Sequence, residues 1–490
     1  MENLSSLQEK GVTFMDAHST PLCAPSRYML LSGNYSHRGK YANGGWGLYV
    51  GQTNLDRRQK SIPHMLKASG YKTANVKYHL GGGVPEGGTY DNEKLTCCNL
   101  DWSKPMVGGP TDLGFDESFY TIGGIQQPPY SFFRDGYLTT DISDVKYWEK
   151  GEYDTANNNG KSIINKAGEG DPDWDSTEFN MRIVQEVENF LEKHDQTSPF
   201  FIYTALGQVH IPHSPPNFYL DGTPIAGTHN NKHLDLLYEM DKVIGSLISS
   251  VESRGMMENT LVIFASDNGG LNKRYPNRLL RGAKGQIYEG GHRVPFVMRY
   301  DGVLPSGERR NNLIGLNDVF ATIAEFTGST IPDRSAQDSI SFAQHAISED
   351  NVSRRKKLGT WDIQDGIMQA ESLRLGNYKY IKHHSQPKKH ELFNIQDDIK
   401  EEKNLLETDP TNTSYHRLKR LMRRKLHRIG PCPRDKNASK EFKLYNGANK
   451  GKKVTCDWFR SNPEVRCKNQ VAGELFCNSI CGRHRHFCNL

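Results

Sequence analysis

Cys23 is isolated in the first part of the chain, since the next cysteines are Cys97 and Cys98. Pro25 follows it by two residues and Arg27 by four. A thiolate is stabilised by a neighbouring cation and is a strong nucleophile, but a base such as histidine must remove its proton. The sequence alone does not place such a histidine, and a buried structural cysteine is the ordinary alternative. Cys23 is thus the first candidate for covalent chemistry.

Three short apolar runs, at residues 72–76, 200–206 and 261–265, predict strands. Each is followed by side chains that bind ions or transfer protons: Lys77 and His79, His210 and His213, and Asp267 and Asn268. Open α/β sheets bind ligands outside the carboxyl ends of their strands, so we expect these side chains to share one crevice. Taken singly, a loop histidine or an Asp-Asn-Gly-Gly turn is more often ordinary surface structure.

Helical periodicity over residues 182–194 and 234–255 alternates with the predicted strands. This alternation predicts an α/β fold with a mostly parallel central sheet flanked by helices. Residues 119–179 are rich in Gly, Asn, Asp and Tyr and have no sustained period. They predict an irregular insertion that faces the substrate.

The composition changes near Pro410. Residues 411–490 carry 19 Lys and Arg against 5 Asp and Glu, whereas the preceding residues carry 43 against 52. We therefore expect a catalytic domain over 1–330, a smaller C-terminal subdomain over 331–410 and a basic, Cys-rich tail module over 411–490. Such a module can bind an acidic polysaccharide, an anionic membrane or nucleic acid, or it can be a solvated basic surface without a ligand.

The tail module holds six of the nine cysteines: Cys432, Cys456, Cys467, Cys477, Cys481 and Cys488. This density favours disulfides, which imply an oxidising compartment. A zinc site is the alternative, although the spacing fits no standard zinc pattern. Its ligands would be Cys477, Cys481, Cys488 and either His484 or His486. The chain has no run of about eighteen apolar residues, so the sequence predicts no membrane span. The first ten residues lack the pattern of a secretory signal.

The segment CAPSRYMLLSG, at residues 23–33, resembles the sulfatase signature Cys-x-Pro-Ser-Arg followed by Leu-Thr-Gly. Other segments resemble the same family in the same order, from about Asn3 to Leu406. They are KYHLG at 77–81, HIP at 210–212, SDNGG at 266–270, GAKGQIYEGGHRVPF at 282–296, and RLGNYKYIK with ELFNIQDDIKEEKNL near the end. The resemblance implies the alkaline phosphatase superfamily fold, closed by a smaller C-terminal sheet.

The resemblance also implies a nucleophile. In sulfatases the signature cysteine is oxidised to formylglycine by a formylglycine-generating enzyme, which would be a partner of Cys23 during maturation. One hydroxyl of the aldehyde hydrate attacks sulfur, and loss of a proton from the other expels sulfate afterwards. By resemblance, Arg27 and Lys77 hold this hydrate, and His79 takes the proton that releases sulfate.

A sulfate ester repels an anionic nucleophile, so the site must neutralise its oxygens and protonate the departing alcohol. By resemblance, Lys284 and His210 bind the ester, with His210 as the acid for the leaving oxygen. Asp267 and Asn268 would bind a divalent cation, and calcium suits their carboxylate and amide oxygens.

The chain departs from the family at its start. Family members have an earlier strand that ends in an Asp-Asp pair and supplies two more carboxylates to the cation, whereas MENLSSLQEKGVTF corresponds to the segment that follows it. Asp16 corresponds to a polar structural position and is not assigned to the cation. Two ligands make a poor calcium site. We therefore expect an incomplete chain, whose lost segment holds the signal peptide of a secreted or lysosome-like protein. The rival interpretation is a truncated, inactive protein.

Smaller departures are Ser32 and Asn34, where the signature has Thr and Arg. Sequons begin at Asn3, Asn34, Asn351, Asn412 and Asn437, and we expect the one at Asn34, beside the nucleophile, to carry no glycan.

The leading interpretation is an enzyme that hydrolyses sulfate monoesters. A sulfated carbohydrate is favoured over an aryl or alkyl sulfate by the basic tail module and the polar insertion. The alternatives are a phosphodiesterase or phosphonate hydrolase of the same superfamily, and an inactive relative that binds sulfated glycans. We expect no specific nucleic-acid partner.

Overall fold

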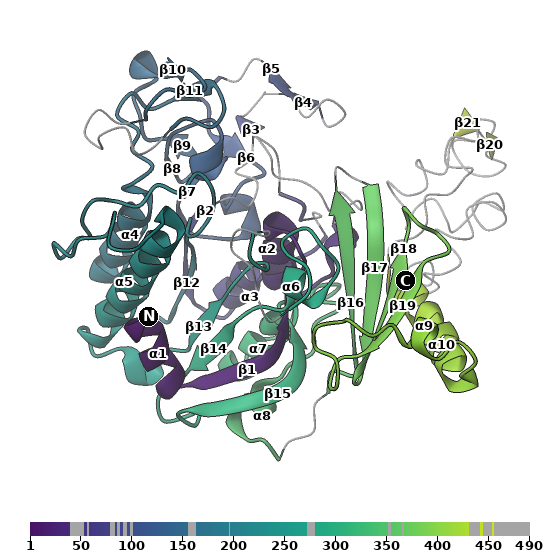
Figure 1. Cartoon of the computed structure of the whole chain (residues 1–490). Helices are drawn as coiled ribbons and strands as arrows, with labels where there is room; N and C mark the ends of the chain where they lie inside the picture. Colours follow the sequence, from purple (N-terminus) through teal and green to yellow (C-terminus); the bar gives the residue numbers. More distant parts are fainter. Residues whose placement is uncertain are drawn as a thin grey trace. The chain divides into compact units, whose positions relative to one another are not determined.

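The computed structural model (Figure 1) describes residues 1–39, 53–55, 58–78, 84–85, 89–91, 96–98, 101–154, 163–195, 197–271, 280–350, 354–364, 367–430, 442–443 and 453–454. The chain divides into two units, Met1–Lys403 and Asn404–Leu490. The domain boundaries expected near residues 330 and 410 stay predictions.

The first sheet of the larger unit has the strand order β13-β14-β1-β15. Its strands are β1 (Val12–His18), β13 (Val262–Ala265), β14 (Phe296–Arg299) and β15 (Glu308–Gly315). β1 runs parallel to β15, whereas β14 runs antiparallel to both β1 and β13. The sheet is therefore mixed, and the parallel arrangement expected from the sequence is interrupted by β14.

The second sheet has the order β12-β2-β7-β8-β9. Its strands are β2 (Lys72–Tyr78), β7 (Glu117–Thr121), β8 (Phe133–Arg134), β9 (Tyr137–Leu138) and β12 (Phe200–Ala205). β12, β2 and β7 are parallel neighbours, with Ala205 opposite Lys77. The carboxyl ends of β2 and β12 therefore meet at one edge, as the sequence predicted.

Helices flank these sheets and confirm the predicted α/β class. They are α1 (Glu2–Glu9), α2 (Cys23–Ser32), α3 (Ile62–Ala68), α4 (Phe179–Lys193), α5 (Lys232–Glu252), α6 (Glu289–His292), α7 (Asp318–Thr327) and α8 (Ala343–Ile347). Figure 1 shows α4 and α5 side by side. Ile183, Val187 and Leu191 form the buried face of α4, and they join an apolar cluster that also contains Phe200 and Ile202 of β12.

The segment expected to be an irregular insertion contains short strands and an aromatic core. Besides β7, β8 and β9, it holds β10 (Lys146–Trp148) paired with β11 (Gly168–Gly170). Tyr130, Trp148 and Trp174 are each at most 3% exposed. Aromatic packing thus holds much of this segment in place, which its polar composition concealed. The remaining short strands are β3 (Val84–Pro85), β4 (Thr89–Asp91), β5 (Thr96–Cys98) and β6 (Met106–Val107).

A smaller antiparallel sheet closes the larger unit, as expected from the resemblance. Its strands follow chain order: β16 (Lys357–Gln364), β17 (Ile367–Leu375), β18 (Tyr378–His383) and β19 (His390–Asn394). Leu373, Tyr380 and Phe393 are fully buried on neighbouring strands. β18 of this sheet supplies Lys379, the buried lysine described next.

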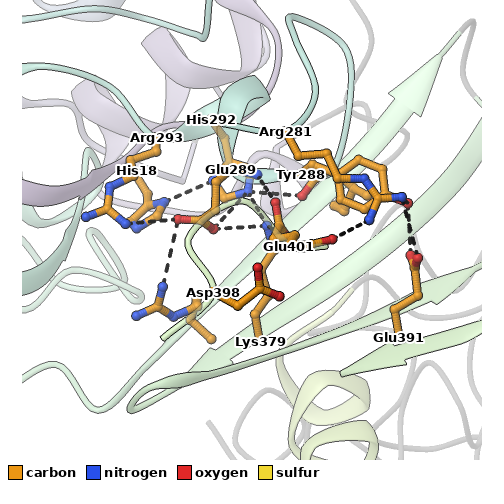
Figure 2. A network of polar contacts seen from close by, with 12 residues as sticks. His18, Arg281, Tyr288, Glu289, His292, Arg293, Lys379, Glu391, Asp398 and Glu401 are labelled. Atoms are coloured by element: carbon orange, nitrogen blue, oxygen red, sulfur yellow. Dashed lines mark hydrogen bonds and ion pairs between the residues drawn. The ribbon is translucent and has the colours of Figure 1, made fainter. Parts of the chain in front are cut away.

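Buried charges join this C-terminal sheet to the segment around α6 (Figure 2). Lys379 of β18 has no solvent exposure, and its Nζ lies 3.0 Å from Glu289 Oε1 and 2.8 Å from Glu401 Oε1. The backbone N–H of Glu289 donates to Glu401 Oε2 at 2.7 Å. A buried ammonium is tolerated only when carboxylates compensate its lost hydration. The three side chains therefore fix the positions of three distant chain segments together.

Two histidines extend these buried charges to the end of β1. His292 Nε2 lies 3.1 Å from Lys379 Nζ, the Nδ1 atoms of His292 and His18 are 3.0 Å apart, and His18 Nε2 lies 2.9 Å from Asp16 Oδ1. An ionised carboxylate can only accept, so His18 donates from Nε2 to Asp16, whereas His292 Nε2 lies close to both the Lys379 ammonium and, at 3.1 Å, the carbonyl oxygen of Ile287. Burial and the charge of Lys379 hold the pKa of His292 well below its usual value, so its ring stays neutral.

His18, Glu289 and His292 also offer three potential metal ligands within 4.8 Å of one another, and no other such group occurs among the described residues. The Lys379 ammonium, however, already contacts both Glu289 and His292. It supplies the positive charge that a cation would bring. We therefore assign this cluster to the structure rather than to metal binding.

The second unit contains α9 (Leu405–Thr408), α10 (Thr413–Ile429), β20 (Phe442–Lys443) and β21 (Lys453–Val454). The cysteines and histidines expected to form disulfides or a zinc site lie outside the described residues. None of the helices in the described ranges is long and apolar enough to cross a membrane.

Replacing Lys379 with methionine should destabilise the protein strongly, because Glu289 and Glu401 would lose their buried counter-charge. Removing one partner of a buried ion pair costs about 3–5 kcal/mol. Lys382→Met on the same strand is the matched control, since Lys382 is 31% exposed and pairs with Glu371 near the surface. It should cost less than about 1 kcal/mol. Urea unfolding followed by tryptophan fluorescence measures both, and equal effects would contradict the structural role of Lys379.

Candidate functional site

The turn between β1 and α2 places Cys23 at the first residue of a helix. The backbone N–H of Thr20 donates to Ser26 Oγ at 3.0 Å, and Ser26 Oγ donates to the carbonyl of Leu22 at 2.8 Å. Pro25 lies in the first helical turn, where a missing N–H leaves no hydrogen bond unmade. The residue types of the CAPSR segment thus build the turn locally, and the positive end of the helix dipole lies at Cys23.

Arg27 lies one helical turn after Cys23 and is 7% exposed. Its Nε and Nη2 donate to the same oxygen of Asp267, Oδ2, at 3.0 and 2.8 Å. Burial would raise the pKa of the Asp267 carboxyl, but Arg27, Lys284 and His210 outweigh it and hold that pKa below the usual value. Asp267 is therefore ionised, and it links the loop after β13 to α2.

The loop after β13 comes very close to the backbone around α6. Ser266 Oγ donates to the carbonyl of Asn268 at 2.9 Å, and the N–H of Gly269 donates to the carbonyl of Gly291 at 2.9 Å. A Cβ on Gly269 would lie 1.8 Å from the carbonyl oxygen of Gly290, so only glycine fits there. This contact explains the glycine at position 269.

Lys284 is held by its backbone between two other site segments. Its N–H donates to the carbonyl of Gly270, and the next N–H, of Gly285, donates to the carbonyl of Pro21, both at 2.8 Å. The same loop is anchored at its start, where Arg281 donates to the carbonyl of Glu401 at 2.6 Å. Lys284 therefore lies beside both the Asp267 loop and the turn before Cys23.

His210 follows β12, and its environment disfavours the charged ring. Burial first, and then the positive charge of Lys284, lower its pKa to about 4, while Asp267 and a hydrogen bond to the carbonyl of Ile211 act in the opposite direction. The Nδ1–H donates to that carbonyl at 2.7 Å, so Nε2 carries no proton in the neutral ring. His213 contacts a different residue, since its ring centroid lies 5.3 Å from that of His233.

Tyr203 of β12 is a site residue that the sequence analysis missed. Burial raises the pKa of its hydroxyl to about 12, and the charges that act on it are those of Arg27, Asp267 and Cys23. The phenol therefore stays neutral and lies among the groups predicted to do the chemistry. In the sequence, Tyr203 lies within an apolar run, and only the alternation of side chains along β12 could have indicated which face it occupies.

Lys77 lies at the carboxyl end of β2, one residue before its last, and pairs with Ala205 of β12. Nothing is described of its side chain, and His79 lies outside the described residues. The roles of Lys77 and His79 therefore stay predictions. The structure brings together the other predicted groups: Cys23, Arg27, His210, Asp267 and Lys284.

Asp267 and Asn268 have the chemistry of a site for a hard cation. Asn268 Nδ2 donates to the carbonyl of Gly269 at 2.9 Å, but the buried Oδ1 has no hydrogen-bond partner among the described residues. A buried carbonyl oxygen without a partner, next to an ionised carboxylate, fits a calcium ligand pair. Asp267 and Asn268 together supply two of the six to eight oxygens that calcium takes.

The two departures from the signature have structural partners. Ser32 Oγ accepts from the backbone N–H of Asn34 at 3.2 Å. Asn34 is fully buried, its Nδ2 donates to the carbonyl of Ser32 at 3.0 Å, and its Oδ1 accepts from the N–H of Gln337 at 2.8 Å. In the folded protein this amide is not available for a glycan.

Family models match most of the chain. Residues 1–329 match the model described as Sulfatase, and residues 283–429 match the one described as N-sulphoglucosamine sulphohydrolase, C-terminal. The chain is similar to the N-acetylgalactosamine-6-O-sulfatase of Bacteroides thetaiotaomicron, with 26% identity over 421 residues that cover 77% of each chain.

Solved structures show the same fold. One, whose title names the metabolism of multiple glycosaminoglycans by Bacteroides thetaiotaomicron, has a TM-score of 0.72 and 22% identity and covers 86% of this chain and 92% of its own. The phosphonate monoester hydrolase of Agrobacterium radiobacter has a TM-score of 0.54 and 16% identity, and the match covers 87% and 89%. The fold is therefore alkaline-phosphatase-like, and it does not by itself choose between sulfur and phosphorus chemistry.

Lys284→Met should raise the pKa of His210, because a nearby positive charge disfavours the imidazolium form. Burial remains the larger cause, so the new value should lie above about 4 and below 6.5. The pH dependence of carbethoxylation at His210, followed by peptide mapping, measures it, since only the neutral ring reacts. The exposed Lys193→Met is the control. An unchanged midpoint in Lys284→Met would show that the lysine does not act on His210.

Proposed function

Because the chain belongs to the sulfatase family, we propose that it hydrolyses sulfate esters of carbohydrates, with Cys23 converted to formylglycine as the nucleophile. The observation that carries this proposal is the arrangement around Cys23. Arg27 and Lys284 supply positive charge there, His210 lies beside Lys284, and Asp267 is held ionised by these groups. Sulfate ester cleavage requires this combination of cations, a proton donor and an anchored nucleophile.

Formylglycine would supply an aldehyde hydrate, with one hydroxyl to attack sulfur and a second to release sulfate afterwards. The residues around it prepare that attack. Arg27 is fixed against Asp267, so its guanidinium group is oriented before the substrate arrives. Two hydrogen bonds hold the backbone at Lys284 and Gly285, and the ammonium of Lys284 would neutralise negative charge on the ester oxygens as the S–O bond to the alcohol breaks.

His210 is proposed to protonate the departing alcohol oxygen. With a pKa of about 4 it is neutral near pH 7 in the free protein, so it must gain its proton when the ester binds or from an acidic medium. An anionic sulfate beside Lys284 would offset the charge that lowers the pKa of His210. The substrate thereby helps to create the acid that cleaves it.

Asp267 and Asn268 are proposed to hold a divalent cation, calcium by ligand type, which would further neutralise the sulfate oxygens. Arg27 donates to one oxygen of Asp267 in this structure. A bound cation would therefore share the Asp267 carboxylate with Arg27. Lys77 and His79, by their resemblance to the family's segment, are proposed to hold the nucleophile and to accept its proton.

The substrate class is proposed from the relatives. The similar Bacteroides protein is named for the 6-O-sulfate of N-acetylgalactosamine. The second family match is named for N-sulphoglucosamine. A sulfated carbohydrate is thus supported over an aryl or alkyl sulfate. Phosphonate ester hydrolysis is the second candidate, because a protein with that name has the same fold.

A secreted or lysosome-like location is proposed for the protein. Six cysteines in the tail module favour an oxidising compartment. This feature fits the secretory route or a compartment reached from it.

Substitution of Cys23 separates the proposed covalent mechanism from its alternatives. Cys23→Ala should lower turnover of a sulfate ester by more than about 10³-fold, because it removes the nucleophile. Cys23→Ser should release about one alcohol per protein and then stop, since a serine can attack sulfur but has no second hydroxyl to expel sulfate. Rapid-quench measurements with an aryl sulfate, and mass spectrometry of the peptide that contains residue 23, test this.

Steady turnover by Cys23→Ser, or an unmodified thiol in an active wild-type protein, would contradict the formylglycine mechanism.

The proposed preference for sulfate over phosphonate esters needs a parallel measurement. Wild-type kcat/KM should be at least about tenfold higher for a sulfate ester than for a phosphonate ester of the same alcohol, a difference of about 1.4 kcal/mol in transition-state stabilisation. The reverse order would favour the second candidate.

Calcium should bind this chain weakly, with a Kd above about 10⁻⁴ M, because the two described ligands are few for this ion and Arg27 shares one of them. Asp267→Asn should abolish even that binding, whereas Asp173→Asn, at an exposed aspartate, should leave it unchanged. Isothermal titration calorimetry measures the three proteins. A Kd below about 10⁻⁶ M for the wild type would mean that further oxygens complete the site.

A further inference from the structure

Helix α10, in the second unit, has an unusual concentration of positive charge. Its 17 residues, TSYHRLKRLMRRKLHRI, include seven Lys and Arg and no Asp or Glu. Its N-cap is Asn412, whose Oδ1 accepts from the N–H groups of Ser414 and Tyr415. The helix therefore begins at a hydrogen-bonded N-cap. Its start does not depend on its charged side chains.

The two faces of α10 differ sharply. Met422 and Leu426 are at most 1% exposed, and Leu418, one turn earlier, is half-buried. The opposite side carries four exposed arginines, spaced by three, four and four residues. These residues, Arg417, Arg420, Arg424 and Arg428, are called the arginine face below. One side of the helix thus packs on protein and the other presents guanidinium groups to solvent.

Contacts among the described residues do not explain the arginine face. Among the residues that the structure describes, no carboxylate forms an ion pair with any of its four arginines. Arg420 and Arg424, and Arg424 and Arg428, are like charges four residues apart, which destabilises a helix by a few tenths of a kcal/mol per pair. Only Arg428, in the last turn, gains from the helix dipole. The charges therefore act against helix stability unless an anion neutralises them.

The shape of the arginine face indicates an extended anion. At a rise of about 1.5 Å per residue, the face extends about 16 Å along the helix axis from Arg417 to Arg428. A guanidinium group binds sulfate or phosphate oxygens through two parallel N–H bonds. A row of four such groups matches a polymer with repeated oxyanions better than one small ion.

Two other polyanions fit the helix less well. A membrane-surface helix inserts its apolar face among lipids, but Met422 and Leu426 are already covered by protein. Single-stranded nucleic acid is bound by basic grooves with aromatic side chains that stack on bases, and α10 offers one aromatic residue, Tyr415. A sulfated carbohydrate polymer needs neither feature.

We propose that the arginine face of α10 is a docking surface for a sulfated polysaccharide, distinct from the residues that cleave the ester. The choice of polymer rests on the proposed function, because an enzyme for carbohydrate sulfates meets this polyanion as its substrate. Docking there would raise the local concentration of sulfate esters around the protein. It would affect KM for polymeric substrates and leave small esters unaffected.

The test uses the full chain with Arg417, Arg420, Arg424 and Arg428 all changed to Gln. The matched control changes four exposed basic residues of the larger unit to Gln, with the same loss of charge: Lys104, Lys150, Lys193 and Arg309. Binding to immobilised heparin is measured at several salt concentrations, with Cys23→Ala in every protein to prevent turnover. Circular dichroism checks that each variant is folded.

We expect the arginine-face variant to bind heparin at least about tenfold more weakly than the control near 0.15 M salt. The slope of log affinity against log salt should also fall by about 3, because fewer ions are released. Equal heparin affinity in the two variants would overturn the proposal. So would binding of the unsubstituted face to single-stranded DNA or to anionic vesicles as tight as to heparin, which would show that the face does not select a sulfated polysaccharide.

A separate measurement distinguishes this proposal from the proposed function. With Cys23 intact, the arginine-face variant should hydrolyse a small aryl sulfate like the wild type and show a raised KM only for a sulfated polymer. If the wild type hydrolyses no sulfate ester, the proposed function fails while the heparin result still decides the docking surface. If the small ester is affected as much as the polymer, the docking role is wrong.

Discussion

One ammonium group constrains the larger unit more than any other charge described. Lys379 has no contact with water, and its position is set by Glu289, 90 residues before it, and by Glu401, about twenty residues after it. Such a group cannot shift without leaving a charge uncompensated in a low-dielectric interior. Through Glu289 the constraint reaches α6, and the carbonyl of His292 then accepts from the N–H of Ser19, four residues before Cys23. Cys23 and the loop of Lys284 thus share one rigid frame with the C-terminal sheet.

Much of the fold and of the site followed from local patterns. Residues 200–206 and 261–265 were predicted as strands and occur as β12 and β13, each one residue shorter. The prediction succeeded because a continuous apolar run of that length is typical of a buried strand. The helix expected at 182–194 occurs as α4, three residues longer at its start. The grouping of Arg27, His210, Asp267 and Lys284 rested on the position of each motif after a strand and on the family resemblance.

The rest depends on contacts between segments that no local pattern records. The antiparallel direction of β14 is set by the hydrogen bonds it makes with β1 and β13. Tyr203 sits in an apolar strand and becomes a site residue only because β12 lies beside α2 and the loop after β13. Lys379 looked like an ordinary lysine in the sequence, since its partners come from distant segments. The aromatic core of the insertion was hidden by the many polar residues between its tryptophans.

The burial of α2 bears on the proposed conversion of Cys23 to formylglycine. Ala24, Pro25, Ser26 and Arg27 are all buried once β1, α2 and the loop after β13 have assembled, and Cys23 alone among these neighbours is partly exposed. An enzyme that recognises the segment by its side chains can therefore reach it only on a chain that has not yet packed α2. Formation of the helix closes that interval. Under the proposed function, the helix that positions Cys23 would thus also end the interval in which residue 23 can be converted.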